Sequence, residues 1–319
     1  MNLVPEAPTN RLEFLVHGDL RITSLASKQM DSYNIQQKYN PFGLDTAYVQ
    51  FVKIESNRKV VAGDSIPLSW QYRGEFKNDH FQLGPSAFYK GWADLEVGSL
   101  WLPTLSNLQH QFHAEVSVTV PDQYTVVGAG SIGKDESQWQ VESTEPSIDF
   151  PLIISDEMLI DHERSETIEL SVYHTGVSDE LIDFVPTNTF KVMKYYKQLF
   201  GDGHQKTTLR VVVPPSTRAR DQAYARPQLI VLSHSSKPNT DTFEFIAHEA
   251  GHLWWLNAAN TQSKHNFMNE AFAEWTLRNN RQLSYYKGSY LLYQLHNRIG
   301  EEYFLKFLRS LLKKQNANH

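Results

Sequence analysis

Residues Ile246 to Trp255 read I-A-H-E-A-G-H-L-W-W and place His248, Glu249 and His252 in the pattern H-E-x-x-H. On a helix, two histidines four positions apart lie on the same face, one turn above the other. Their ring nitrogens can then converge on one metal ion, and Zn²⁺ accepts neutral imidazole nitrogen at about 2.0–2.1 Å. Glu249 follows the first histidine directly, which suits a general base. The stretch therefore predicts one wall of a zinc site.

The residues around this pattern distinguish it from a solvated surface helix. Apolar side chains occupy most sides of the predicted helix: Phe243, Phe245, Ile246, Leu253, Trp254 and Trp255. A histidine in such surroundings needs a polar partner, because burying a polar group without one costs free energy. The alternative, in which both histidines are merely solvated, is therefore disfavoured.

A third ligand is expected from the next predicted helix, within N-E-A-F-A-E-W at residues 269–275. Seventeen residues separate His252 from Glu270, and the polar loop among them lets the second helix fold back antiparallel. Glu274 lies one turn after Glu270 on the same face. It is expected either to accept the free ring N–H of a ligating histidine or to be a solvated helix residue.

Length and composition indicate an ordinary globular protein with two domains. The chain has 319 residues, which exceeds one average domain, and 40% of them are hydrophobic. The sequence has no cysteine, which excludes disulfides, thiolate zinc ligands and cysteine nucleophiles. Its net charge of −6 is spread over interspersed acidic and basic residues, so no nucleic-acid partner is expected.

Hydropathy predicts a soluble chain without a membrane span. No apolar run approaches the roughly 18 residues that cross a bilayer. The first residues have neither the basic nor the apolar region of a signal peptide. The cytoplasm is therefore favoured over export with a removed leader, and the oligomeric state stays open.

The N-terminal half predicts an all-β domain, a sandwich or saddle-shaped sheet, at residues 1–162. Its dominant signal is short alternating stretches separated by turn residues. The clearest stretches run from Leu12 to Leu20, Thr46 to Ile54, Ile66 to Tyr72, His113 to Val120 and Tyr124 to Gly130.

Residues 163–319 predict an α+β domain, because strands and helices follow one another there. Strands are expected at Ile168 to Tyr173, Leu209 to Val213 and Gln228 to Leu232. Helices are expected at Asp179 to Phe200, Thr240 to Trp255, Phe267 to Arg281, Tyr286 to Ile299 and Glu301 to Leu312. Pro186 either splits the first helix or marks its start.

Several motifs together resemble a known family. H-E-A-G-H is followed by N-E-A-F-A-E-W, by Y-Y-K-G at residues 285–288 and by G-E-E-Y-F at residues 300–304. This combination resembles the aminopeptidase N family of zinc metallopeptidases in the gluzincin clan, specifically over residues 240–304 and loosely elsewhere. The resemblance implies a β-sheet domain followed by a thermolysin-like α+β catalytic domain, with the family's C-terminal helical domain absent.

The same resemblance implies roles for individual residues. His248, His252 and Glu270 are expected to bind one Zn²⁺ per chain, with Glu249 as the general base in the hydrolysis of a peptide substrate. Tyr285 matches the family tyrosine that stabilises the tetrahedral intermediate, and its alternative is a core aromatic. The spacer before Glu270 has seventeen residues rather than the family's eighteen, a loop change that two helices can absorb.

One departure concerns the substrate's free amine. The family binds it with the glutamate of a G-x-M-E-N strand, and the matching position here is Ala225. A buried ammonium needs an anionic partner, which leaves Asp94 or Glu96 as candidates for this role. Arg226 is a further substrate-binding candidate, with a solvated side chain as its alternative.

Three functions follow as hypotheses. The first is a zinc metallopeptidase that acts like an aminopeptidase. The second, motivated by Ala225, is an endopeptidase or a peptidase of blocked or atypical N-termini. The third is a non-catalytic pseudopeptidase that binds a partner, which the complete set of catalytic residue types disfavours.

Overall fold

The computed structural model describes residues 1–39, 48–76, 87–89, 91–106, 110–165, 168–201, 208–215, 223–232, 237–255, 270–273 and 287–316. The chain forms two compact units. The first unit holds residues 1–114 and 146–154, and the second holds residues 115–145 and 155–319. The division into domains at residues 162 and 163 stays a prediction.

The described part of the first unit consists of strands and one short 3₁₀ helix, Val97–Ser99. Its largest sheet has the order β10-β2-β5-β4, and β3 pairs separately with β7. The strands are β1 (Asn2–Leu3), β2 (Thr9–His17), β3 (Arg21–Ala26), β4 (Ser32–Tyr39), β5 (Tyr48–Val60), β6 (Ile66–Pro67), β7 (Ser69–Arg73), β8 (Ala87–Tyr89), β9 (Trp92–Leu95), β10 (Thr104–Leu105) and β15 (Leu152–Ser155).

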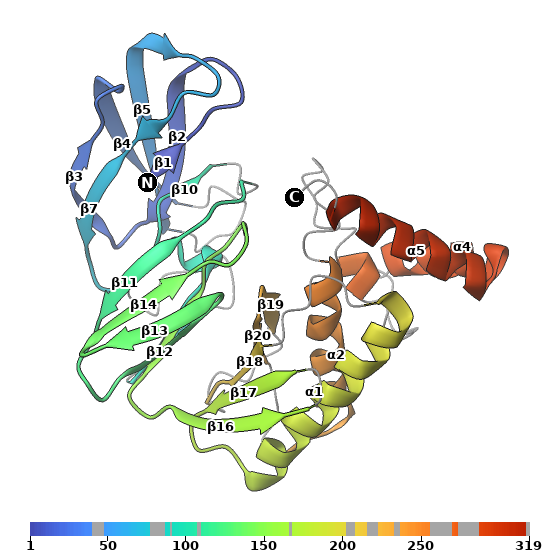
Figure 1. Ribbon diagram of the computed structural model, residues 1–319. Coiled ribbons are helices and arrows are strands. Elements are labelled where there is room, and N and C mark those ends of the chain that lie inside the picture. Colours follow the sequence, from blue (N-terminus) through green and yellow to red (C-terminus); the bar gives the residue numbers. More distant parts are fainter. Residues whose placement is uncertain are drawn as a thin grey trace. The chain divides into compact units, whose positions relative to one another are not determined.

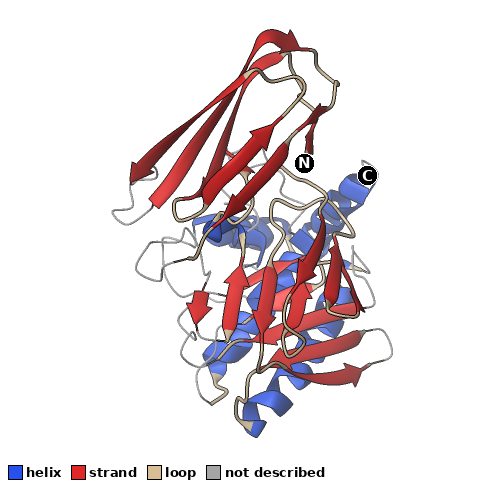
Figure 2. Ribbon diagram, turned by 90° about the vertical axis from the view of Figure 1, so that its left-hand side faces the viewer, coloured by secondary structure: helices blue, strands red, loops and turns tan. Residues whose placement is uncertain are grey.

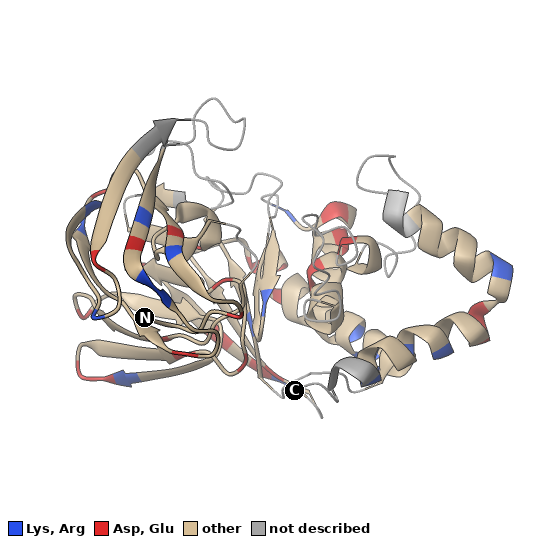
Figure 3. Ribbon diagram, turned by 90° about the horizontal axis from the view of Figure 1, so that it is seen from above, with Lys and Arg blue, Asp and Glu red and all other residues tan. Residues whose placement is uncertain are grey.

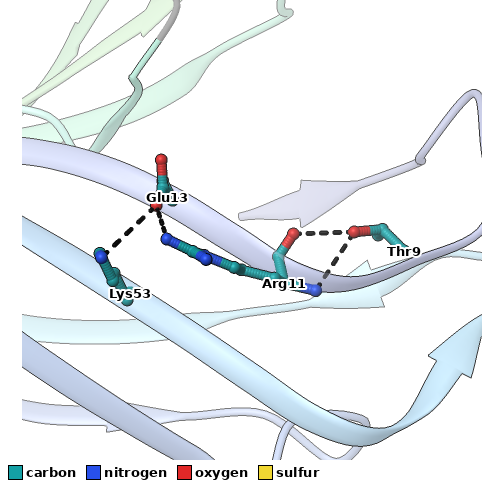
Figure 4. Close-up of polar contacts among 4 residues, drawn as sticks. All are labelled: Thr9, Arg11, Glu13 and Lys53. Atoms are coloured by element: carbon teal, nitrogen blue, oxygen red, sulfur yellow. Dashed lines mark hydrogen bonds and ion pairs between the residues drawn. The ribbon is translucent and has the colours of Figure 1, made fainter.

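One face of the β2–β5 pair contributes alternate residues to the core, as the alternation of the sequence predicts. Phe14, Val52 and Ile54 lie in the core, where Phe14 contacts the ring of Trp70 edge-on at 5.2 Å. Polar contacts lie nearby on the same two strands (Figure 4). Glu13 pairs there with Arg11 and with Lys53, whose Nζ is 3.9 Å from the carboxylate. Lys and Arg alternate with Asp and Glu over the strands of this unit (Figure 3).

The second unit is built on a five-stranded mixed sheet with the order β16-β17-β18-β20-β19. The three central strands are parallel, and both edge strands run antiparallel to their neighbours. The central strands are rich in buried valine and leucine, as expected for a sheet covered on both faces. The strands are β16 (Leu159–Arg164), β17 (Glu169–His174), β18 (Thr208–Val213), β19 (Tyr224–Arg226) and β20 (Leu229–Val231).

A small antiparallel sheet with the order β11-β14-β13 also belongs to the second unit. Arg210 of β18 connects the two parts, because its Nη1 donates a hydrogen bond to the carbonyl oxygen of Gly130 over 2.6 Å. The strands of this sheet are β11 (Glu115–Thr119), β13 (Ser131–Asp135) and β14 (Gln138–Glu142). Strand β12 (Thr125–Gly128) also lies within the residues of this unit but is not part of this sheet.

Four helices of the second unit have both ends described: α1 (Asp179–Phe200), α2 (Thr240–Trp255), α4 (Lys287–Ile299) and α5 (Glu301–Asn316). Helices α1 and α2 pack against each other and lie on one side of the five-stranded sheet (Figures 1 and 2). None of the described helices combines the length and hydropathy needed to cross a membrane. The predicted α+β class is confirmed, and the helices predicted at residues 179–200 and 240–255 have these bounds.

Pro186 neither splits the first helix nor marks its start, because α1 continues through it. A proline inside a helix removes one backbone hydrogen bond and usually costs about 3 kcal/mol. Here Pro186 is buried, in a helix that also contributes Leu181 and Val185 to the hydrophobic core. Burial of this apolar face accounts for its position within one continuous helix.

Candidate metal centre

Helix α2 carries the H-E-x-x-H pattern, and its first turn is fixed by a reciprocal cap. The backbone N–H of Thr242 donates to Oδ1 of Asn239 over 2.9 Å. The backbone N–H of Asn239 donates in return to Oγ1 of Thr242 over 3.3 Å. The side-chain oxygens of Asn239 and Thr242 thus accept hydrogen bonds from backbone N–H groups at the start of the helix, which have no partner within the helix itself. The helix therefore begins two turns before His248, and its register fixes which residues face the sheet.

Helix α1 holds α2 in place through an aromatic cluster. The ring of Tyr196 contacts the ring of Trp254 edge-on at 5.4 Å. Its hydroxyl donates a hydrogen bond to the carbonyl oxygen of Ala247 over 3.0 Å. Nε1 of Trp254 donates to the carbonyl oxygen of Gly201 over 3.4 Å, at the end of α1. These contacts fix the position of α2 along α1.

Glu270 approaches α2 on a second helical segment, residues 270–273. Within this segment the ring of Phe272 stacks on the ring of Trp255 at 4.6 Å with an interplanar angle of 19°. Ala271 and Ala273 are buried as well. Small residues on both sides of one large aromatic let the segment pack closely against the end of α2.

Three atoms from these two segments form a tight triangle. Nε2 of His248 lies 3.1 Å from Nε2 of His252. Oε2 of Glu270 lies 3.3 Å from Nε2 of His248 and 3.6 Å from Nε2 of His252. The sequence placed the two histidines on one face of a helix, and the tertiary structure brings the carboxylate to them.

These distances fit a metal ion with tetrahedral geometry. Four ligands at about 2.0–2.1 Å from a tetrahedral ion lie about 3.3–3.4 Å from one another. The three measured separations lie around this value. Two imidazoles and one carboxylate leave one of four positions open, which distinguishes a catalytic from a closed structural zinc site. The residues present therefore fit a zinc ion.

Glu249 lies beside this triangle and is almost fully buried, with 5% of its surface exposed. Its Oε2 makes no hydrogen bond with any described residue. Burial raises the pKa of Glu249 to about 7, which the charge of Glu270 also favours, while His248 and Arg226 act in the opposite direction. A bound cation would lower this pKa, because an opposite charge stabilises the carboxylate.

The pKa of Glu270 is shifted in the opposite direction from that of Glu249. Burial raises its pKa, but the hydrogen bond to His248 and the charges of both histidines outweigh burial, so the pKa of Glu270 is lowered. The guanidinium of Arg226 contributes to this lowering. Glu270 is therefore held as an anion, the form that binds a metal ion.

The strand β19 brings Ala225 and Arg226 to α2, against which it packs. The side chain of Ala225 is only 1% exposed and lies in the same core cluster as Ile246 and Ala250 of α2. Arg226, the next residue of the strand, is half-buried. Its positive charge favours a lower pKa for both Glu249 and Glu270. The structure thus places Arg226, a predicted substrate-binding residue, next to the histidine and glutamate cluster.

The structure does not test the roles of the remaining predicted site residues. Tyr285 and Glu274 fall outside the described residues, so their roles stay predictions. Asp94 and Glu96 belong to the first unit and are buried, with 0% and 2% of their surfaces exposed. Their predicted contact with a substrate amine stays a prediction.

Sequence reasoning missed the residues that hold the two segments together. Tyr196 is one of the residues at helical spacing in the helix predicted at residues 179–200, and Trp255 lies in the predicted H-E-x-x-H helix. Phe272 belongs to the N-E-A-F-A-E-W motif. None of the three was predicted to position the metal centre. The helical spacing of Tyr196 predicted its burial. Nothing in the sequence pointed to its hydrogen-bond partner on another helix.

No protein-family model matches the sequence, and no curated protein matches it. An M1 zinc metallopeptidase from Deinococcus radiodurans is similar in structure, with 15% identity, a TM-score of 0.69, and 98% of this chain and 80% of that chain covered. A mutant from the same organism, bound to a Tyr-Ser-Ala substrate, has 14% identity and a TM-score of 0.71, with 98% of this chain and 81% of that chain covered.

Yeast LTA4 hydrolase in complex with bestatin is similar as well, with 15% identity and a TM-score of 0.69. The alignment covers 96% of this chain and 56% of that chain. At such identities the similarity establishes the fold. The chain has the α+β fold of the M1 zinc metallopeptidases, which confirms the resemblance at the level of structure.

Proposed function

We propose that the chain is a zinc-dependent metallopeptidase that hydrolyses peptide bonds. The observation that carries the proposal is the triangle of two Nε2 atoms and one carboxylate oxygen, with separations of 3.1, 3.3 and 3.6 Å, beside the buried Glu249. The M1 zinc metallopeptidase fold supports it, since the similar structures from Deinococcus radiodurans bear that name.

His248, His252 and Glu270 hold one Zn²⁺ in this proposal. When bound, Zn²⁺ polarises a carbonyl group and lowers the pKa of water toward about 7. The low pKa of Glu270 keeps that ligand ionised, and the hydrogen-bonded register of α2 keeps both imidazoles aimed at one point.

Glu249 is the general base. It accepts a proton from the attacking water and later delivers it to the amine of the leaving peptide. Its burial keeps bulk water away from the carboxylate, and Oε2 is without a described protein partner. Tyr285 is proposed as the donor to the developing oxyanion.

The edge of the five-stranded sheet supports a peptide as the substrate. Strand β19 is at that edge among the described strands, and it packs against the helix that carries the histidines. An edge strand offers unpaired backbone groups to an extended peptide, which binds as an additional strand. The scissile bond is then brought to the metal centre along β19.

A second candidate activity concerns the amine end of the substrate. Aminopeptidase-like action needs an anion for the substrate's α-ammonium, and the buried Ala225 provides none on β19. This observation favours a peptidase that acts on internal bonds or on blocked N-termini. Free and N-acetylated forms of the same peptides separate the two activities, because only an aminopeptidase prefers the free amine.

Zinc content and activity test the main proposal together. Purified protein is expected to hold one zinc per chain, to lose peptide hydrolysis on chelation and to regain it with Zn²⁺. Protein that binds no zinc, or that hydrolyses peptides equally well without it, contradicts the proposal.

A further inference from the structure

Strand β4 forms one edge of the largest sheet in the first unit. Among the described strands it pairs only with β5, and this pairing runs from Ser32 to Tyr39 without a shift in register (Figure 1). The outer side of an edge strand presents a row of backbone N–H and C=O groups to which a further strand can bind. The backbone of β4 is therefore suited to accept another strand.

The core-facing side of the sheet continues onto β4, where it is no longer covered. Residues directly opposite each other on neighbouring strands point to the same face. Tyr33 lies opposite Ile54, which is 2% exposed, whereas Tyr33 itself is 48% exposed. Ile35 lies opposite Val52, which is 0% exposed, whereas Ile35 is 37% exposed. The apolar face of the sheet thus ends in two side chains that remain in contact with solvent.

The sequence of β4 lacks the features by which edge strands usually avoid pairing. Such features are charged side chains, proline, bulges and a very short strand. Residues 32–37 read S-Y-N-I-Q-Q, without charge or proline, and residues 32–36 are all exposed. The neighbouring inner strand β5 carries four charged residues, Lys53, Glu55, Arg58 and Lys59. The edge strand is thus less charged than the strand that it shields.

The exposed part of β4 is complementary to itself in antiparallel orientation. When Asn34 lies opposite Asn34 of a second copy, Tyr33 lies opposite Ile35, and Ser32 lies opposite Gln36. Aromatic residues paired with β-branched residues stabilise neighbouring strands. Both such pairs then lie on the apolar face, while the two asparagine amides can bond to each other on the other face. No charges oppose each other among these five residues.

We propose that β4 is an interface between two copies of the chain, which pair through antiparallel β4 strands around a twofold axis at Asn34. The two four-stranded sheets then form one continuous sheet. Twofold interfaces of this kind, in which both copies use the same surface, are the commonest among homo-oligomers. Another extended peptide could use the same backbone groups, but a second copy also supplies the matching side chains. The inference is independent of the proposed peptidase function.

The size of this interface predicts a dimer that dissociates on dilution. An eight-residue strand is about 26 Å long, so the paired strands form an interface at the small end of the range known for proteins. Sedimentation velocity between about 1 and about 300 µM covers the affinities expected for an interface of this size. The wild-type chain is expected to change from monomer to dimer within that range. A chain that stays monomeric throughout overturns the inference.

Like charges on the twofold axis are expected to separate the two copies. Asn34→Lys and Asn34→Asp each place two equal charges opposite each other and should raise the dissociation constant at least about tenfold. A mixture of the two variants should recover the dimer, because opposite charges then face each other, and this recovery also shows that both variants fold. Gln138→Lys is the control, since it adds the same charge at an exposed position of the central strand β14. It should leave the dissociation constant unchanged.

Disulfide formation tests the register directly, because the chain has no cysteine of its own. Directly opposite residues of antiparallel strands have Cα atoms about 4.5–5.5 Å apart, within the reach of a disulfide. Asn34→Cys is therefore expected to form a covalent dimer under mild oxidation. Ser32→Cys is the matched control in the same strand. Its two copies lie about 13 Å apart in this register and should remain reduced.

The two experiments together decide the inference. Efficient cross-linking of Asn34→Cys without cross-linking of Ser32→Cys supports the paired β4 strands. Equal cross-linking of both variants reflects random collision and overturns them. A wild-type dimer that both Asn34→Lys and Asn34→Asp leave intact overturns the inference as well and assigns the association to another surface.

Discussion

The hydroxyl of Tyr196 on α1 donates a hydrogen bond to the carbonyl oxygen of Ala247 on α2, over 3.0 Å. Ala247 precedes the first histidine of the H-E-x-x-H pattern directly. The contact therefore fixes α2 at the turn where the metal centre begins. It is buried, together with the ring of Tyr196, which is only 2% exposed.

Tyr196→Phe is expected to lower the free energy of unfolding by about 1 kcal/mol, the usual net value of one buried hydrogen bond. The ring remains, so packing against Trp254 is kept. Chemical denaturation measures the change. Tyr195→Phe is the control. The side chain of Tyr195 is 41% exposed, so this change should alter the free energy of unfolding by less than about 0.5 kcal/mol. A Tyr196 variant as stable as wild type would contradict this role of the hydrogen bond.

Phe272→Ala is expected to cost about 3–5 kcal/mol, because it leaves a cavity against Trp255. Since the stacked ring also positions Glu270, zinc affinity should fall along with stability. Phe272→Leu fills most of the volume and should keep the protein folded, which allows zinc affinity to be measured by chelator competition. Unchanged zinc affinity in this leucine variant would show that the ring does not position Glu270.

Glu249→Gln is expected to lower kcat by about 10²–10⁴, the usual contribution of a general base. Bound zinc should stay at the wild-type level, since the ligands are untouched. Asp241→Asn, an exposed change in the first turn of the same helix, is the control and should keep full activity. Peptide hydrolysis and metal analysis on the same preparations check both statements, and full activity in the Gln variant contradicts the proposed mechanism.

The stability of metal-free protein should depend on pH through Glu249. Its pKa rises from 4.5 to about 7 in the folded state, so the folded protein binds more protons between these values than the unfolded chain. The contribution of Glu249 to stability is therefore expected to be most favourable below about pH 4.5 and to fall as the pH rises toward 7. The full effect is on the order of 3 kcal/mol, at about 1.4 kcal/mol per unit of pKa.

Glu249→Gln lacks this titration, so the chelator-treated variant should become more stable than chelator-treated wild type as the pH rises. Denaturation curves at a series of pH values measure the difference. A constant difference between the two proteins across this range would show that burial of the carboxylate has no such effect.

Zinc itself should stabilise the folded chain. A ligand that binds only the folded state at about 1,000 times its Kd adds about 4 kcal/mol to stability. Chelation is thus expected to lower the melting temperature, and added Zn²⁺ to restore it. Glu270→Gln should weaken this response, because it removes the anionic ligand. Equal melting temperatures with and without zinc contradict the predicted site.

The positions of the main helices could be predicted from the sequence because they depend on local patterns. Apolar spacing and flanking residues gave the bounds of α1 and α2, and the four-residue spacing placed His248 and His252 on one face. Pro186 shows the limit of such rules. Its place inside α1 depends on the burial of its ring, which is a tertiary contact.

The electrostatics of the centre could not be predicted in this way. The desolvation that raises the pKa of Glu249 comes from elements distant in the sequence, and so does the charge of Arg226. The burial of Ala225 beneath α2 depends on the same packing. No local pattern contains these distances.

The sequence by itself determined the metal-binding face of α2, because backbone hydrogen bonds of a helix fix the relative positions of residues four apart. Only the tertiary structure decided that Glu270 lies 3.3 Å from His248 and that Arg226 acts on both glutamates. Those relations depend on how Phe272 stacks on Trp255 and how β19 packs on α2. Packing between distant segments is a property of the whole core, and short patterns do not encode it.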